Sequence, residues 1–333
     1  MDDYYSAHGN GGTGELGNSL YVTDNEFKEF AEGIRAKIVG VVNSGSFAEV
    51  ILEFEFDKPV KNGEYSLENL TIDAYPDVLY SYSYGMLSTS DSGRIYSTVL
   101  LRDTENIPED MTMTMEFTTL DKANSQNVHN TDETYADDPS IKINGNFSAE
   151  FMLGSTIKPS VINIEPTEIS WTQPYMKGAV AEMEMSGLEY SPKYVNIDLR
   201  MLNECIVKWR YEGEGGRGYS QYCNNSSMFF HPGGDSLKML DYETTEDEYI
   251  ALKFKMSDGT LKTADIMYIE SNAVNDIDKN TLVTDDDWIK ASWDIPSDKP
   301  ATITFMLTGI MDYTDVEAIV FCGEEFPITE KNF

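Results

Sequence analysis

Residues 36–56 read AKIVGVVNSGSFAEVILEFEF, and this stretch decides the fold. An apolar run reaches a turn at Asn43-Ser-Gly45, and a second run follows in which apolar and acidic side chains alternate. A period of two is the pattern of an antiparallel strand with one buried face and one solvated face. We therefore expect a hairpin whose second strand buries its apolar members and exposes its glutamates: Val50, Leu52, Phe54 and Phe56 inside, and Glu49, Glu53 and Glu55 outside.

Similar strand patterns recur along the whole chain, separated by turn signals. The strongest hairpin signal is Ser257-Asp-Gly259, which lies between two further alternating runs. One short helix is expected over residues 24–33, with Asp24 or Asn25 as its cap and Gly33 as its end. The other periodic segments predict strands near 36–43, 47–56, 66–73, 77–84, 93–101, 111–120, 141–152, 160–171, 177–188, 194–200, 204–211, 248–256, 260–269, 301–308 and 315–321.

The length of 333 residues predicts two domains rather than one small sandwich. The character of the sequence changes at Gly154-Ser-Thr-Ile-Lys-Pro159, where we place the boundary. Residues 1–24 are rich in Gly, Asp and Asn and are expected to form a flexible lead-in or linker. We thus predict an all-β chain of two consecutive antiparallel β-sandwich, immunoglobulin-like domains, over residues 25–155 and 156–333, with little helix.

The chain is strongly acidic, with 58 Asp and Glu against 24 Lys and Arg and a formal net charge of -34. The acidic residues are spread over both halves, so the charge belongs to the whole surface. Such a surface repels phosphate backbones and anionic lipid headgroups, which excludes nucleic acid as a partner. Two interpretations remain open: solubility outside a cytoplasm, or attraction for cations or a basic partner.

Candidate metal and cofactor motifs are weak. Residues 276–287 place Asp276, Asp278, Asn280 and Asp287 at calcium-loop spacing, although Thr281 stands where the sharp turn favours glycine. This loop is a candidate for weak calcium binding, with an ordinary acidic loop as the alternative. No other cofactor is expected. Residues 213–218 match G-x-G-x-x-G, but no helical period follows, so a hairpin loop is favoured over a nucleotide site. Three cysteines, Cys205, Cys223 and Cys322, form neither a disulfide framework nor a metal-binding spacing, and buried free thiols are favoured over a disulfide between Cys205 and Cys223.

Tyr80, Tyr82 and Tyr84 alternate with serines and so share one face of a strand. Aromatic side chains in this arrangement bind sugars or protein edges, or pack across strands. They are the candidate contacts for a ligand or partner. No pattern in the sequence indicates a nucleophile, a zinc site or a catalytic carboxylate pair, and we predict that the chain is not an enzyme.

Four motifs, taken in order, carry a family resemblance. They are the hairpin that begins at residue 36, the strand opening Ile164-Glu-Pro-Thr-Glu-Ile-Ser-Trp171, the hairpin Phe254-Lys-Met-Ser-Asp-Gly-Thr-Leu261, and the closing segment of residues 312–328. Together they resemble the extracytoplasmic domain of unknown function of anti-sigma-factor-like membrane proteins from Gram-positive bacteria. The resemblance covers roughly residues 36–328. It implies a module outside the membrane and offers no catalytic residues.

These patterns lead to two functional hypotheses. The first is a non-enzymatic, extracytoplasmic sensing or binding region of a membrane-anchored anti-sigma-factor-like protein, which contacts an unknown envelope ligand or protein. The second is a surface adhesin or carbohydrate-binding module. Under the first, the chain lies on the extracellular face of the cell membrane and contacts the membrane only through an N-terminal anchor absent from this chain. The sequence contains no run of the roughly 20 apolar residues that form a transmembrane helix.

Overall fold

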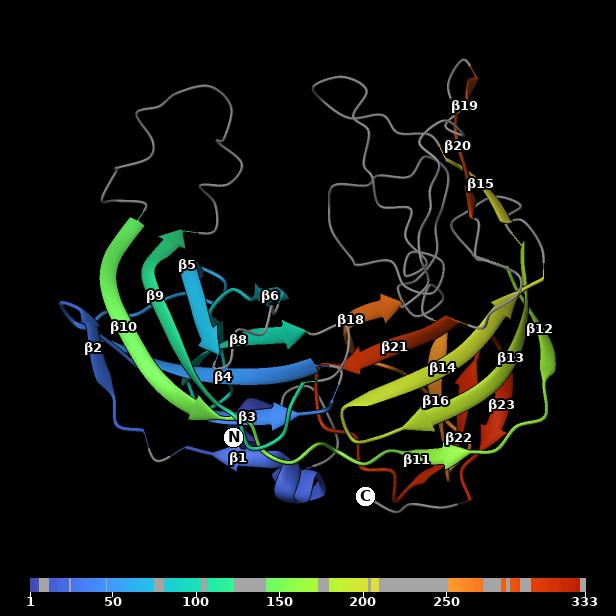
Figure 1. Cartoon of the computed structure of the whole chain (residues 1–333), viewed down its shortest axis with the longest axis horizontal. Coiled ribbons are helices and arrows are strands. Elements are labelled where there is room, and N and C mark those ends of the chain that lie inside the picture. Colours follow the sequence, from blue (N-terminus) through green and yellow to red (C-terminus); the bar gives the residue numbers. More distant parts are fainter. Residues whose placement is uncertain are drawn as a thin grey trace. The chain divides into compact units, whose positions relative to one another are not determined.

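The structure, a computed structural model, describes residues 1–5, 12–23, 25–45, 47–74, 81–102, 107–122, 142–172, 180–202, 205–209, 251–271, 283–285, 288–293 and 301–329. These residues form an all-β protein in which every paired strand is antiparallel, with only two short helical segments among them (Figure 1). The predicted fold class is confirmed. The chain divides into two compact units, Met1–Lys158 and Pro159–Asn332. Near this boundary, the backbone amides of Thr156 and Ile157 donate hydrogen bonds to the Glu109 carboxylate and the Asn43 carbonyl, which also belong to the first unit.

The first unit contains two sheets. The larger, sheet A, has the order β1-β3-β4-β8-β6, with β2 beside β3 and β7 beside β8. The smaller, sheet B, has the order β10-β9-β5. The strands of sheet A are β1 (Leu20–Val22), β2 (Lys28–Ala31), β3 (Ile34–Asn43), β4 (Phe47–Phe56), β6 (Ser81–Tyr84), β7 (Ser88–Thr89) and β8 (Ile95–Arg102), and those of sheet B are β5 (Tyr65–Ala74), β9 (Thr112–Lys122) and β10 (Lys142–Met152).

Sheets A and B enclose one apolar core. Inward side chains of β3, β4 and β8 pack with those of β5, β9 and β10, so the predicted inner face of the second hairpin strand is correct. Phe117 lies at the centre, with its ring centroid 4.8 Å from that of Phe147 and 5.9 Å from that of Phe54. Because burial of apolar area is the main favourable term in folding, this core holds the two sheets together.

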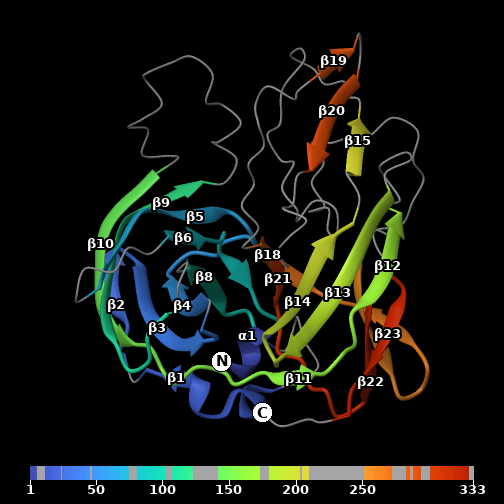
Figure 2. The ribbon, with the colours of Figure 1, turned by 45° about the vertical axis from the view of Figure 1, so that its right-hand side comes forward.

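The second unit contains three sheets. Sheet C has the order β11-β13-β14-β21-β18, with β12 also beside β13, and sheet E has the order β17-β16-β22-β23 (Figure 2). Sheet D is a separate ribbon of order β15-β20-β19. The strands are β11 (Ser160–Ile162), β12 (Thr167–Thr172), β13 (Val180–Tyr190), β14 (Tyr194–Met201), β15 (Cys205–Trp209), β16 (Leu252–Met256), β17 (Leu261–Thr263), β18 (Ile266–Ser271), β19 (Val283–Asp285), β20 (Trp288–Trp293), β21 (Ala301–Leu307), β22 (Val316–Phe321) and β23 (Glu324–Pro327).

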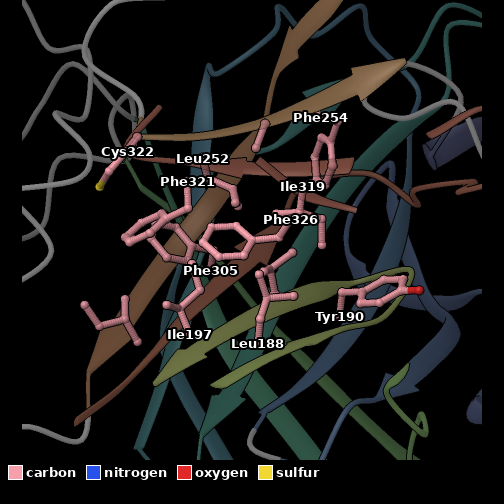
Figure 3. Close-up of a cluster of buried hydrophobic side chains, with 14 of the residues drawn as sticks. Leu188, Tyr190, Ile197, Leu252, Phe254, Phe305, Ile319, Phe321, Cys322 and Phe326 are labelled. Atoms are coloured by element: carbon pink, nitrogen blue, oxygen red, sulfur yellow. The ribbon is translucent and has the colours of Figure 1, made fainter. Parts of the chain in front are cut away.

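Sheets C and E share the core of the second unit. Phe305 of sheet C and Phe321 of sheet E meet edge to face with centroids 5.8 Å apart (Figure 3). The predicted hairpin at Ser257-Asp-Gly259 is confirmed, because β16 and β17 pair across it and Gly259 has a φ of 81°. Cys322 is free and buried in the tight turn between β22 and β23, as expected for a structural thiol.

Sheets A and C repeat the same design, which the sequence did not reveal. In each, two short strands share the edge of a long strand, which forms a hairpin with the next strand. The long strand is bulged at the same place: the register shifts between Ile38 and Gly40 in β3, and between Met185 and Gly187 in β13. The turn between β3 and β4 and the turn between β13 and β14 also begin alike. In each, a serine hydroxyl, of Ser44 or of Ser191, donates to the backbone carbonyl three residues further along the chain.

Two local predictions are wrong. The segment expected to be a helix over residues 24–33 contains strand β2, because pairing with β3 and burial of Phe30 outweigh the weak capping signals. Gly33, with a φ of 75°, makes the turn between β2 and β3 instead of ending a helix. Glu49 and Glu53 were expected to face solvent, but they are 0% and 7% exposed.

Candidate functional site

The residues predicted to contact a calcium ion, Asp276, Asp278, Asn280 and Asp287, all lie outside the described part of the chain, as does the glycine-rich loop at 213–218. Tyr80 is also outside it. Tyr82 and Tyr84 belong to β6 at the edge of sheet A, where they pair with Leu101 and Val99 of β8. The structure therefore brings these predicted residues into no common site within the part that it describes.

A different group of residues comes together on the outer face of sheet A, where the N-terminal segment packs. The described part of residues 1–24 consists of helix α1 (Asp2–Tyr5), the 3-10 helix η1 (Thr13–Ser19) and strand β1, which pairs with β3. Tyr4, Tyr5 and Leu16 of this segment are buried. The prediction of a flexible lead-in is wrong for these residues, because their apolar and aromatic side chains find a complementary sheet face.

The centre of this site is the carboxylate of Glu49 on β4, which is fully buried. The Tyr5 hydroxyl donates to Glu49 Oε2 at 2.7 Å, and the Tyr4 hydroxyl lies 3.2 Å from Oε1. Tyr4 Oη is also 2.5 Å from the Thr98 hydroxyl on β8. A buried carboxylate is costly unless it accepts hydrogen bonds, and here each oxygen has a phenolic donor.

The residues that precede the tyrosines, Asp3 and Met1, also lie against the first unit. Asp3 accepts hydrogen bonds through one carboxylate oxygen from the hydroxyls of Ser90, Ser92 and Tyr96, at 2.8, 2.8 and 3.1 Å. Met1 fills a hollow above Gly40, where an added Cβ would lie 2.8 Å from the Met1 sulfur. The glycine at the bulge of β3 therefore gives the N-terminal segment room to approach the sheet.

Burial governs the acid–base behaviour of this site. Loss of solvation, followed by repulsion from the Glu49 carboxylate, raises the pKa of Tyr4 and of Tyr5 well above the ordinary value of 10. Both phenols are therefore protonated donors at neutral pH. Because Glu49 is fully enclosed, the arrangement is suited to holding the segment on the sheet and not to reacting with a solute.

The sequence contained a partial signal for this site. The acidic face of β4 also carries Ile51, which is fully buried although it alternates with Glu49 and Glu53. An apolar residue inside an otherwise charged face indicates that something covers it. The covering segment could not be found, because Tyr4 and Glu49 are 45 residues apart in the chain.

The described residues contain no group of three or more His, Cys, Asp and Glu that could hold a metal ion. Within the same ranges, no helix is long and apolar enough to cross a lipid bilayer.

Comparison with known proteins identifies no family. No family model matches the chain, and no curated protein matches it. Among solved structures, the chain is similar to a conserved domain protein from Bacillus anthracis, with 10% identity and a TM-score of 0.43. That match covers 96% of this chain and 83% of the other.

Proposed function

We propose that this chain is a non-enzymatic, extracytoplasmic sensing or binding region of a membrane-anchored anti-sigma-factor-like protein. Two lines support the proposal. The sequence motifs over residues 36–328 resemble that family, and the N-terminal segment is docked on sheet A through buried contacts to Glu49. In such a protein the N-terminal side leads to the membrane, so a docked segment couples the anchor to the β3–β4 hairpin. The docking is the observation that carries this proposal.

The mechanism follows from the energetics of the segment. Helix α1 is a single turn, and so short a helix is not stable by itself. It persists only through its contacts with the sheet. A ligand or partner that strains the sheet, or tension on the segment, shifts the balance between docked and released states. In this way the docked segment transmits a binding event on the folded unit to the proposed membrane anchor.

The test uses the natural gene with all coding sequence upstream of Met1. An apolar stretch of about 20 residues after a short basic segment is the expected finding. Cell fractionation and protease treatment of intact cells should then place the protein in the membrane fraction with residues 1–333 accessible from outside. A protein recovered in the soluble cytoplasmic fraction and protected from the protease would contradict the proposal.

The alternative function is a surface adhesin or carbohydrate-binding module, for which the edge position of β6 with Tyr82 and Tyr84 provides a motive. Glycan-array binding that is lost in a Tyr82→Ala and Tyr84→Ala double variant would favour this alternative.

A further inference from the structure

The N-terminal segment, made of α1, η1 and β1, is held together by contacts of its own. Asp2 Oδ1 accepts hydrogen bonds from the amide and from the hydroxyl of Thr13, at 2.9 and 2.6 Å. The hollow above Gly40 is bordered by the Met1 side chain and by the Tyr21 carbonyl oxygen, so the start of the chain meets β1 there. The three elements therefore cover the outer face of sheet A as one unit.

The connection from this segment to the rest of sheet A has spare length. β1 and β2 lie along the same edge of β3, since both pair with it and β4 occupies the other edge. From the pair Val22–Gly40 to the pair Lys28–Ala36, the edge advances by six residues and β3 by four. Thr23, at the start of the connection, still bonds to the Val39 carbonyl. The spare residues allow the segment to leave while β2 keeps its pairing with β3.

The face under the segment recognises it through buried polar groups. The Glu49 carboxylate, 0% exposed, accepts the hydroxyl hydrogens of Tyr4 and Tyr5, and the Tyr96 hydroxyl, on a residue 1% exposed, donates to Asp3. A buried ion adds little net stability compared with apolar residues of the same volume, but it is costly when its partner is absent. The face is therefore selective: it accepts an aspartate followed by two tyrosines and rejects an apolar cover.

A second copy of this chain carries the segment that fits this face. If two copies exchange their N-terminal segments symmetrically, each segment makes on the other copy the contacts that it makes on its own. The exchange then costs mainly the freedom lost on association, and anchoring in one membrane lowers that cost by raising the effective concentration. The charge of -34 on each copy opposes association that is not specific.

We propose that the outer face of sheet A, centred on Glu49, Tyr96 and Thr98, binds the N-terminal segment of a second copy, so that two copies exchange segments and form a symmetric dimer. The released state of one copy is thus captured by its neighbour. This inference rests on the proposed function for the release of the segment, and it deepens that function by naming the partner of the vacated face.

The test mixes two full-length variants that are each defective in one half of the contact. In Tyr4→Ala, Tyr5→Ala the face is intact and the segment lacks both phenols. In Glu49→Leu, Thr98→Val the segment is intact and the face lacks its polar groups. Circular dichroism verifies the fold of each variant. The milder variants Tyr4→Phe, Tyr5→Phe and Glu49→Gln replace any that does not fold.

Sedimentation velocity compares the equimolar mixture with each variant alone. Only in the mixture does an intact segment meet an intact, vacant face. The mixture should therefore form a dimer of one copy of each variant, at least about tenfold more tightly than either variant associates with itself.

Two tyrosines of the donated segment locate the contact. Tyr5→Phe, added to the Glu49→Leu, Thr98→Val copy, should weaken the mixed dimer by about tenfold or more, because a hydrogen bond to a charged group is lost. Tyr21→Phe in the same copy is the matched control. It changes a partly exposed tyrosine of β1 and should leave the association unchanged.

Two outcomes overturn the proposal. One is a mixture that associates no more tightly than its two components do alone, and the other is equal weakening by Tyr5→Phe and Tyr21→Phe. Neither result depends on where the chain lies in the cell, so failure here and failure in the fractionation experiment are distinguishable.

Discussion

Tyr5→Phe removes one hydroxyl from the interior of the first unit and leaves the ring in place. The lost bond joins Tyr5 Oη to Glu49 Oε2 at 2.7 Å, and the two residues are 1% and 0% exposed. A hydrogen bond to a charged group contributes about 1.5–3 kcal/mol. Because water cannot reach the carboxylate to replace the donor, we expect a loss of about 2 kcal/mol in the free energy of unfolding. For a unit of this size that corresponds to a fall of about 4–8 °C in Tm.

The assay is urea unfolding followed by circular dichroism, with two comparison variants. Tyr21→Phe changes a partly exposed residue of β1 and should stay within about 0.5 kcal/mol of the parent. Tyr313→Phe removes a buried hydroxyl that donates at 3.1 Å to the neutral Ser191 carbonyl, and should cost about 1 kcal/mol. If Tyr5→Phe costs no more than Tyr21→Phe, the carboxylate is not held by this phenol and the reasoning fails.

Three further predictions concern pH, a glycine and a thiol. The pKa of Tyr4 and Tyr5 is raised above the unfolded value of about 10, so their contribution to stability is present below pH 10 and lost as the pH rises through the folded pKa. The urea midpoint of the parent protein should therefore fall between about pH 9 and about pH 11, and that of a Tyr4→Phe, Tyr5→Phe variant should fall less over the same range. An equal fall in the two proteins would count against the site. Gly145→Ala should cost at least about 1–3 kcal/mol, because the new Cβ would lie 2.2 Å from the Phe30 carbonyl oxygen, whereas Gly14→Ala has open space and serves as the control in the same unfolding experiment. Burial raises the pKa of the Cys322 thiol, so a variant that keeps only this cysteine should resist a thiol reagent until denaturant is added; rapid labelling of the native protein would contradict its burial.

Sequence periodicity was sufficient for the fold class because it reports the inner faces of strands. Val50, Leu52 and Phe54 lie in the core where the alternation places them. The same pattern was misleading for Glu49 and Glu53, since a charged face usually faces water. Glu49 is bonded by Tyr4 and Tyr5 of the N-terminal segment, and Glu53 forms ion pairs with Lys37 and Arg94. A period of two contains no information about such contacts.

The N-terminal segment and the repeat were missed for related reasons. Glycine-rich composition indicates a linker when considered alone, yet Tyr4 and Tyr5 dock because a complementary face exists on β4 and β8. The repeat is carried by the bulges at Gly40 and Gly187 and by strand order, while most aligned side chains differ. The calcium candidate at residues 276–287 and the role of Tyr82 and Tyr84 remain predictions.

The central claim is that residues 1–5 are docked on sheet A through Glu49. Nuclear magnetic resonance of the full chain tests it most directly, through contacts between the rings of Tyr4 and Tyr96 and the amide exchange of Tyr4 and Tyr5. The ring centroids are 5.5 Å apart, and both amides bond to the Met1 carbonyl. The account predicts cross-peaks between these two rings and amide exchange slowed well below random-coil rates. Random-coil shifts for Tyr4 and Tyr5, with no contact to Tyr96, would contradict it.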